Sequence, residues 1–200
     1  LRFPAGLERE YRQSHLGRVA TRVRGWQASL LVVALIAAAY RFAIFGSFGL
    51  NLETILRVGV LLPACLAMLI AAFGRQYQPR YLSTAFTGSL ITAAATGILI
   101  AMSVAEGHDS ALTFLTTFLF ATFCLTGLLL LDAVLVAAIG TLAFAVASSY
   151  FGVSPDPLAY SLLLLSAVAC IGGFIAYGVE VTNRRMFLER GVLGDLAERG

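Results

Sequence analysis

The chain of 200 residues is 59% hydrophobic and 12% charged, with a mean hydropathy of +0.86, whereas about a quarter of the residues in a soluble domain are charged. This composition excludes a soluble globular domain, and the high apolar content also excludes a disordered chain. Three cysteines cannot form a paired disulfide framework. The net charge of +3 comes from 14 basic residues, all of them arginine, and 11 acidic residues. The composition therefore predicts an all-α integral membrane protein.

The two ends of the sequence indicate part of a longer protein. The chain begins at Leu1 without an initiator methionine, and Gly200 falls within a stretch that is typical of a helix. We therefore expect that part of the function resides outside these 200 residues.

Residues 1–25 predict an amphipathic helix on the cytoplasmic surface of the membrane. Leu7, Tyr11, Val19 and Val23 recur at multiples of four positions, and the arginines of this segment mostly occupy other positions. We expect the helix to lie along the inner leaflet, where each arginine gains roughly 1 kcal/mol beside anionic headgroups. Nucleic acid is the less favoured partner for this basic run, and we expect none.

Six apolar runs follow, each close to the ~20 residues that cross a bilayer core of ~30 Å. The stretch 111–151 contains one charge, Asp132, and as a single helix it would be roughly 60 Å long, which is twice the bilayer. We therefore expect a tight turn near Asp132 between two spans, and a break at the prolines before the last span. The predicted spans are 26–45, 54–73, 81–105, 111–131, 133–151 and 158–181, which together form a six-helix sensor domain over 26–181.

The distribution of arginine predicts the orientation of these spans. Arginines precede the first span, lie between the second and third, and follow the sixth, whereas the other loops carry Glu53, Glu106, Asp109 and Asp156. Cytoplasmic flanks retain arginine. We therefore expect both termini in the cytoplasm and three short outer loops.

Small residues and one proline predict how the spans pack. A small residue recurs every four positions in span 81–105 and, less regularly, in span 133–151, which indicates packing seams within or between protomers. Pro63 should kink the second span. The cysteines are interpreted as small packing residues; they are Cys65, Cys124 and Cys170. The seam residues are Ala85, Ser89, Ala93, Gly97 and Ala101 in the first of these spans and Ala133, Ala137, Thr141 and Ala145 in the second.

Charges inside the first two spans form the candidate ligand site. Arg41 and Arg57 lie in the outer third of their spans, where a charge costs free energy, up to ~3 kcal/mol at a helix centre. Glu53 precedes Arg57 by four residues, which is the favourable order for a helical ion pair. One interpretation is that the pair extends to the outer headgroups. The other is an outward-facing pocket of Arg41, Arg57, Glu53 and Tyr40 for an anionic or lipid-like small molecule.

The outer loop 106–110 carries three further candidate ligand-binding residues, Glu106, His108 and Asp109. Asp109 and Ser110 suit the N-cap of the next span, so a solvated turn is the favoured interpretation. A metal site needs more ligands than this loop offers, and we expect none. Because histidine changes its charge near neutral pH, sensing of the outer pH is the second interpretation.

Residues 182–200 predict a cytoplasmic signalling and dimerisation helix that continues the last span. Met186 and Leu193 are seven residues apart, and Leu196 occupies a plausible second seam position, which gives a partial heptad pattern. We expect a homodimer in which Asn183, Met186, Leu193 and Leu196 transmit a signal to an output domain.

Both ends of the chain resemble one protein family. Leu193 to Arg199, Leu-Gly-Asp-Leu-Ala-Glu-Arg, resembles the helix that precedes the catalytic domain of membrane-bound GGDEF diguanylate cyclases. Leu1-Arg2-Phe3-Pro4 with Leu7-Glu8-Arg9-Glu10-Tyr11-Arg12 resembles the start of these multi-span sensor enzymes. The resemblance implies that the chain lies in a bacterial inner membrane and that an output domain condenses two GTP into cyclic di-GMP with Mg²⁺. The GGDEF signature is outside these residues, so no catalytic residue is carried over.

Two other function classes stay open. The sequence contains no phosphate loop, Ser-His-Asp set, zinc signature or nucleotide-binding glycine pattern, so we expect no active site and no cofactor in this chain. The membrane anchor of a class III adenylate cyclase or of a histidine kinase has the same architecture. A small transporter is the third interpretation, but transporters usually show broken helices and internal repeats, and only Pro63 points that way.

Overall fold

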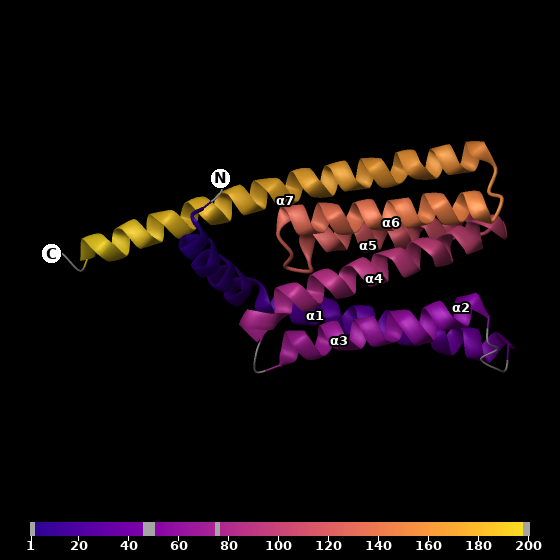
Figure 1. Ribbon diagram of the computed structural model, residues 1–200, viewed down its shortest axis with the longest axis horizontal. Helices are drawn as coiled ribbons and strands as arrows, with labels where there is room; N and C mark the ends of the chain where they lie inside the picture. Colours follow the sequence, from indigo (N-terminus) through magenta and orange to yellow (C-terminus); the bar gives the residue numbers. More distant parts are fainter. Residues whose placement is uncertain (1–2, 46–50, 75–76, 198–200) are drawn as a thin grey trace.

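The computed structural model is an elongated bundle of helices (Figure 1), and it describes residues 3–45, 51–74 and 77–197. Every element that these residues form is helical. The second rod of the bundle is made of three consecutive pieces, the fourth is a short 3₁₀-helix followed by an α-helix, and the others are single helices. In chain order they are α1 (Ala5–Phe45), α2 (Leu52–Thr54), η1 (Ile55–Leu61), α3 (Leu62–Phe73), α4 (Tyr77–Ala105), η2 (Asp109–Ala111), α5 (Leu112–Cys124), α6 (Leu130–Tyr150) and α7 (Pro155–Ala197).

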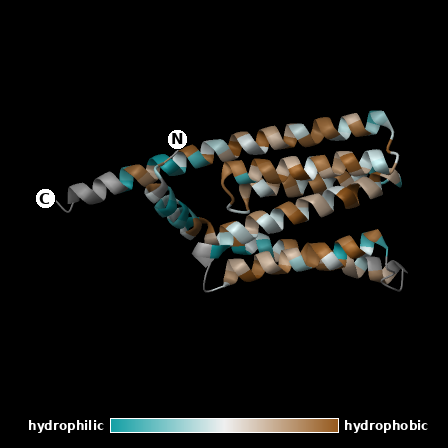
Figure 2. Cartoon of the chain, in the orientation of Figure 1, coloured by the Kyte–Doolittle hydropathy of each residue, from teal (hydrophilic) through white to brown (hydrophobic). Residues whose placement is uncertain are grey.

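The rods alternate in direction, so that both ends of the chain lie at the same end of the bundle (Figure 1). This terminal end holds the first part of α1, the start of α4, the loop 125–129 and the exit of α7. The distal end holds α2, the turn 106–108 and the start of α7. Polar residues gather on the first part of α1 and on α7 where it leaves the bundle, whereas the shafts of the helices are mostly apolar (Figure 2).

Among the residues that the structure describes, five helices are long and apolar enough to cross a membrane. The apolar helix Asp109–Cys124 is shorter than this limit, and its α-helical part, α5, has 13 residues where a span needs about 20. The all-helical fold is therefore confirmed, with five helices that are able to span a membrane where the sequence predicts six. The five candidate spans are Gly6–Tyr40, Leu52–Phe73, Arg80–Ala105, Leu130–Tyr150 and Pro155–Arg190.

The short α5 follows from the position of the turn that ends it. The turn expected near Asp132 lies earlier, at residues 125–129, and Asp132 belongs to the first turn of α6. Gly127 has a φ of 73°, a conformation that glycine adopts without the strain that a Cβ would add. The backbone therefore reverses at Gly127, and the predicted span 111–131 ends at Cys124.

Pro63 changes the geometry of the helical turn that precedes it. The residues Ile55–Leu61 form a π-helix, and the Leu62 N–H donates to the carbonyl of Arg57, five residues back. Proline has no N–H to donate, and its ring crowds the carbonyl four residues earlier, which here belongs to Gly59. The wider π-helical turn accommodates both effects, and π-helical turns occur frequently at functional sites.

The small residues of α4 form a seam inside the protomer. Ala85, Ala93 and Ala101 are fully buried, and α4 packs most extensively on α6. A Cβ added at Gly97 would lie 2.6 Å from the carbonyl oxygen of Gly140, so only glycine allows the two backbones to approach this closely. The interpretation of this series as a packing seam is therefore confirmed.

Candidate functional site

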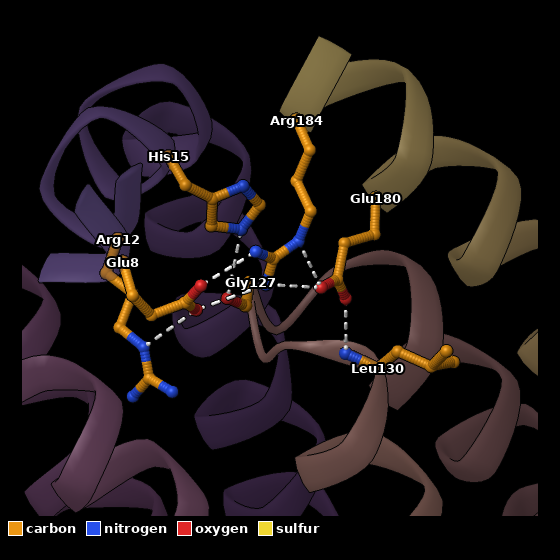
Figure 3. A network of polar contacts seen from close by, with 7 residues as sticks. All are labelled: Glu8, Arg12, His15, Gly127, Leu130, Glu180 and Arg184. Atoms are coloured by element: carbon orange, nitrogen blue, oxygen red, sulfur yellow. Dashed lines mark hydrogen bonds and ion pairs between the residues drawn. The ribbon is translucent and has the colours of Figure 1, made fainter. Parts of the chain in front are cut away.

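Arg184 is the centre of a polar cluster at the terminal end. It lies on α7 and is 6% exposed. Its Nη1 and Nη2 donate to the two carboxylate oxygens of Glu8 at 2.7 and 3.1 Å, and its Nε donates to Oε1 of Glu180 at 2.9 Å (Figure 3). A guanidinium that binds one carboxylate through two parallel hydrogen bonds fixes both distance and orientation. We call Glu8, Glu180 and Arg184 the Arg184 clamp.

The faces of the guanidinium are covered by aromatic rings. The Arg184 Cζ lies 4.5 Å from the ring centre of Tyr11 and 5.0 Å from that of Phe3. Phe187, one turn further along α7, meets Tyr11 edge to face at 5.7 Å. Cation–π contacts of this kind stabilise a positive charge that has lost water. The aromatic rings therefore limit the access of solvent to the Arg184 guanidinium.

The clamp also holds the start of α6. Oε2 of Glu180 accepts a hydrogen bond from the Leu130 N–H at 2.9 Å (Figure 3), and the first N–H groups of a helix have no partner within it. A carboxylate at this position also interacts favourably with the positive N-terminal end of the helix dipole. Because Glu8 belongs to α1, the clamp ties the exit of α7 to two other helices.

Arg12 balances the charge of the clamp. Two carboxylates and one guanidinium carry a net charge of −1, and the Arg12 Nε lies 3.4 Å from Oε1 of Glu8. The four side chains together are neutral. A desolvated ionic cluster is tolerated when its charges are paired and hydrogen-bonded in this way.

The loop 125–129 packs against the first part of α1. The His15 Nε2 lies 3.3 Å from the carbonyl oxygen of Gly127, and a Cβ added at Gly127 would lie 2.8 Å from Val23. Val23 and Tyr11, expected to face lipid, are fully buried in the protein. The apolar stripe of residues 1–25 is therefore covered mainly by this loop and by α7, because protein packing fills the space in which lipid was expected.

Two of the predicted transmission residues, Asn183 and Met186, lie next to Arg184 on α7, but the sequence did not single out Arg184. Asn183 lines a small cavity of about 150 Å³ beside Glu180, and Met186 is 37% exposed. Leu193 and Leu196 belong to α7, but their side chains lie outside the described residues. The spacing of four between Glu180 and Arg184 was a visible signal of an ion pair. The contact with Glu8 could not be predicted from the sequence, since Glu8 lies 176 residues from Arg184.

At the distal end, the expected ion pair between Glu53 and Arg57 is present. The Arg57 Nε donates to Oε1 of Glu53 at 3.0 Å, and both side chains are about three-quarters buried. Tyr40 is 68% exposed and does not line the cavity that Arg57 borders. The side chain of Arg41 lies outside the described residues. The structure therefore joins Arg57 with Glu53 and leaves Tyr40 apart.

Arg57 borders a partly open cavity of about 270 Å³ between α1, η1–α3, α4 and α5. Its wall is mostly aliphatic and aromatic, with hydroxyls from Thr92, Thr96 and Ser103. Thr92 is 2% exposed, and its hydroxyl has no hydrogen bond of standard geometry among the described residues, although the thiol of Cys65 lies beside it. An apolar cavity with a few polar groups is the usual form of a small-molecule site.

The outer loop candidates are exposed in a turn next to this cavity. Glu106, His108 and Asp109 are exposed, and Gly107 has a φ of 86° that forms the turn. The N-cap of η2 is His108, where Asp109 or Ser110 was expected. The three side chains therefore lie at the rim of the distal end and outside the cavity lining.

No protein-family model matches the chain, and no curated protein or solved structure matches it. The function is therefore inferred from the geometry of the two ends of the bundle.

Proposed function

We propose that this chain is the membrane-embedded sensory and dimerising region of a bacterial diguanylate cyclase, and that α7 transmits a signal to a GGDEF domain that makes cyclic di-GMP from GTP. The observation that carries the proposal is the clamp on a continuous exit helix. The 43 residues of α7 correspond to roughly 65 Å, about twice the bilayer core. Such a helix spans the membrane and extends beyond it without a break.

In this proposal both termini are cytoplasmic and six helices cross the bilayer. Arginine at the terminal end supports this orientation, and the even number of rods places both ends on one side. The helix Asp109–Cys124 measures roughly 24 Å, and the loop 125–129 continues it to the terminal end. The loop then lies at the cytoplasmic headgroups, where its polar backbone groups find partners.

The contacts of α7 suit a transmission element. In the most apolar window of α7 only 11% of the residues are buried, compared with 56% in α4. The helix is therefore loosely packed along its shaft and firmly held at Arg184. A change in the bundle that moves Glu8 or the start of α6 would displace the side chains of the clamp. The exit helix α7 would then transmit this displacement as a rotation or a shift.

The proposed input is a small molecule with an apolar body and an anionic or lipid-like head, bound from the outer side. The Arg57 cavity supports this step through its aliphatic wall and its charged border. The adjoining π-helix Ile55–Leu61 is a wider helical turn that a ligand could convert to a regular helix.

The proposed homodimer uses the side of α7 that faces away from the clamp. Met186 and Val179 are exposed and apolar and lie seven residues apart. They are about 160° and 140° around the helix axis from Arg184, respectively. Apolar side chains on a helix that leaves the membrane gain stability only from a partner, and a second copy offers the same stripe.

The test measures the product of the full-length protein. Membranes that contain it are supplied with GTP or ATP in the presence of Mg²⁺, and cyclic di-GMP, cyclic AMP and phosphorylated protein are quantified. We expect cyclic di-GMP from GTP, and a several-fold change in its rate in Arg184→Gln but not in the neighbouring Arg185→Gln. Cyclic AMP from ATP, or a phosphorylated histidine, would replace the diguanylate cyclase with one of the two rival output domains.

A further inference from the structure

A second polar cleft opens at the terminal end, on the lipid side of the first part of α1. It has a volume of about 520 Å³ and lies between α1 and the first turns of α4 and α6. Its polar walls are Arg9, Arg12 and Gln13 from α1, Ser83 from α4 and Asp132 from α6. Neither the clamp nor the Arg57 cavity includes this group of residues, apart from Arg12 at the edge of the clamp.

Asp132 is the unusual member of this group. Its side chain is partly buried in the first turn of α6, and among the described residues its carboxylate forms no hydrogen bond or ion pair within 4 Å. The N-terminus of α6 offsets part of the cost of this charge. A partly desolvated carboxylate still favours a cationic partner, and the cleft leaves room for one.

The arginines of the cleft supply the opposite charge at its rim. Arg9 and Arg12 are exposed and one turn apart on the same side of α1, which allows two guanidinium groups to bind one phosphate. The 3.4 Å contact of Arg12 with Glu8 is long for a charge-assisted hydrogen bond. The cleft therefore combines a phosphate-binding rim with a carboxylate at its base.

The apolar wall of the cleft shows where the ligand comes from. Leu82 and Phe86, both partly exposed, border the cleft from α4, at the start of the candidate span Arg80–Ala105. In the proposed orientation the cleft therefore lies where the headgroup layer meets the acyl chains. A molecule with a phosphate, a nearby ammonium group and an acyl chain fits all three walls.

We propose that this cleft binds a phospholipid with a phosphoethanolamine headgroup. The phosphate lies on Arg9 and Arg12, the primary ammonium donates hydrogen bonds to the Asp132 carboxylate, and an acyl chain follows Leu82 and Phe86. A choline headgroup has no N–H to donate to Asp132, and a glycerol headgroup has no positive charge. The cleft therefore selects the primary ammonium, whichever output domain the protein carries.

The test measures lipid binding to the purified full-length protein by native mass spectrometry. The probes share the same acyl chains and carry phosphoethanolamine, its N-methyl and N,N-dimethyl forms, phosphocholine or phosphoglycerol. We expect affinity to fall along the methylation series, with phosphoethanolamine bound roughly tenfold more tightly than phosphocholine, as one hydrogen bond to a charged group provides. Equal affinity across the series would overturn the proposal without any variant.

Variants locate the site. Asp132→Asn should abolish the preference for phosphoethanolamine and keep residual phosphate binding, whereas Arg9→Gln with Arg12→Gln should weaken binding of all the lipids. The matched control is Arg18→Gln with Arg22→Gln, which removes the same charge from the same helix outside the cleft. If the control weakens binding equally, or if Asp132→Asn retains the preference, the lipids bind through general charge attraction and the cleft is not their site.

Discussion

Glu8 and Arg184 lie 176 positions apart in the sequence and form two hydrogen bonds, at 2.7 and 3.1 Å. They join the first turn of the first helix to the part of the last helix that leaves the bundle. A contact between the first turn of α1 and the exit of α7 is suited to control α7, which is the transmission element of the proposed function. Because the contact depends on two named side chains, substitutions of them measure what the clamp contributes to folding.

Replacing Arg184 should destabilise the protein. Arg184→Gln leaves Glu8 and Glu180 without their cation in a largely buried cluster, and we expect a loss of about 2 kcal/mol, below the range for fully buried pairs because both carboxylates are about one-fifth exposed. Thermal unfolding in detergent measures the effect. Arg185→Gln is the control, since Arg185 is exposed. A double-mutant cycle with Glu8→Gln that gave no coupling would remove the ion pair as the cause.

Gly127 should tolerate alanine less well than Gly107 does. Both have a positive φ, 73° and 86°, so alanine is strained at either position, by about 1 kcal/mol. A Cβ at Gly107 meets open space, whereas one at Gly127 would lie 2.8 Å from Val23. We expect a further 1–2 kcal/mol of destabilisation, roughly, in Gly127→Ala from overpacking. Equal unfolding temperatures for the two variants would show that the loop does not press against α1.

Filling the Arg57 cavity should stabilise the bundle. Ala34 lines the cavity, and Ala34→Leu should raise the free energy of unfolding by about 1 kcal/mol, as cavity-filling substitutions commonly do. Ala39→Leu, on the exposed side of the same helix, is the matched control and should have little effect. A loss of stability in Ala34→Leu alone would mean that the cavity is too narrow to accept a side chain. The same variant should also abolish any ligand-dependent change in output.

The proposed dimer predicts a position-specific cross-link. With Cys65, Cys124 and Cys170 replaced by alanine, a cysteine at Met186 should cross-link two copies through a short bismaleimide. A cysteine at Arg185 is rotated by about 100° from it and should cross-link poorly. Dimer bands on a denaturing gel measure the yield. Similar yields at both positions would indicate random collision, and no cross-link at either would exclude this side of α7.

The proposed orientation predicts which side of the membrane each loop occupies. In the same cysteine-free background, a cysteine at His108 should react with a membrane-impermeant maleimide in intact spheroplasts. A cysteine at Arg190 should react only after the membrane is opened. Both side chains are exposed in the fold, so access to the reagent decides the outcome. Labelling of both from the same side would contradict the proposed crossings.

The sequence by itself determined those features that depend on composition and on neighbours along one helix. An apolar content of 59% requires lipid contact, the four-residue repeat of Ala85, Ala93 and Gly97 requires close packing, and the Glu53–Arg57 pair needs only one helical turn. These properties are local, because a helix places residues four apart on one side whatever surrounds it.

Only the tertiary structure decided what covers each apolar side and which charges meet. Tyr11 and Val23 fit a membrane surface and a protein interior equally well by periodicity. The packing of α7 on Tyr11 and of the loop at Gly127 on Val23 resolved the choice. The length of α5 depended on where the chain turns, which hydropathy does not mark within a continuous apolar run. The Arg184 clamp joins residues 176 positions apart, and such a pairing exists only once the helices between them have packed, because no local pattern encodes the distance between their ends.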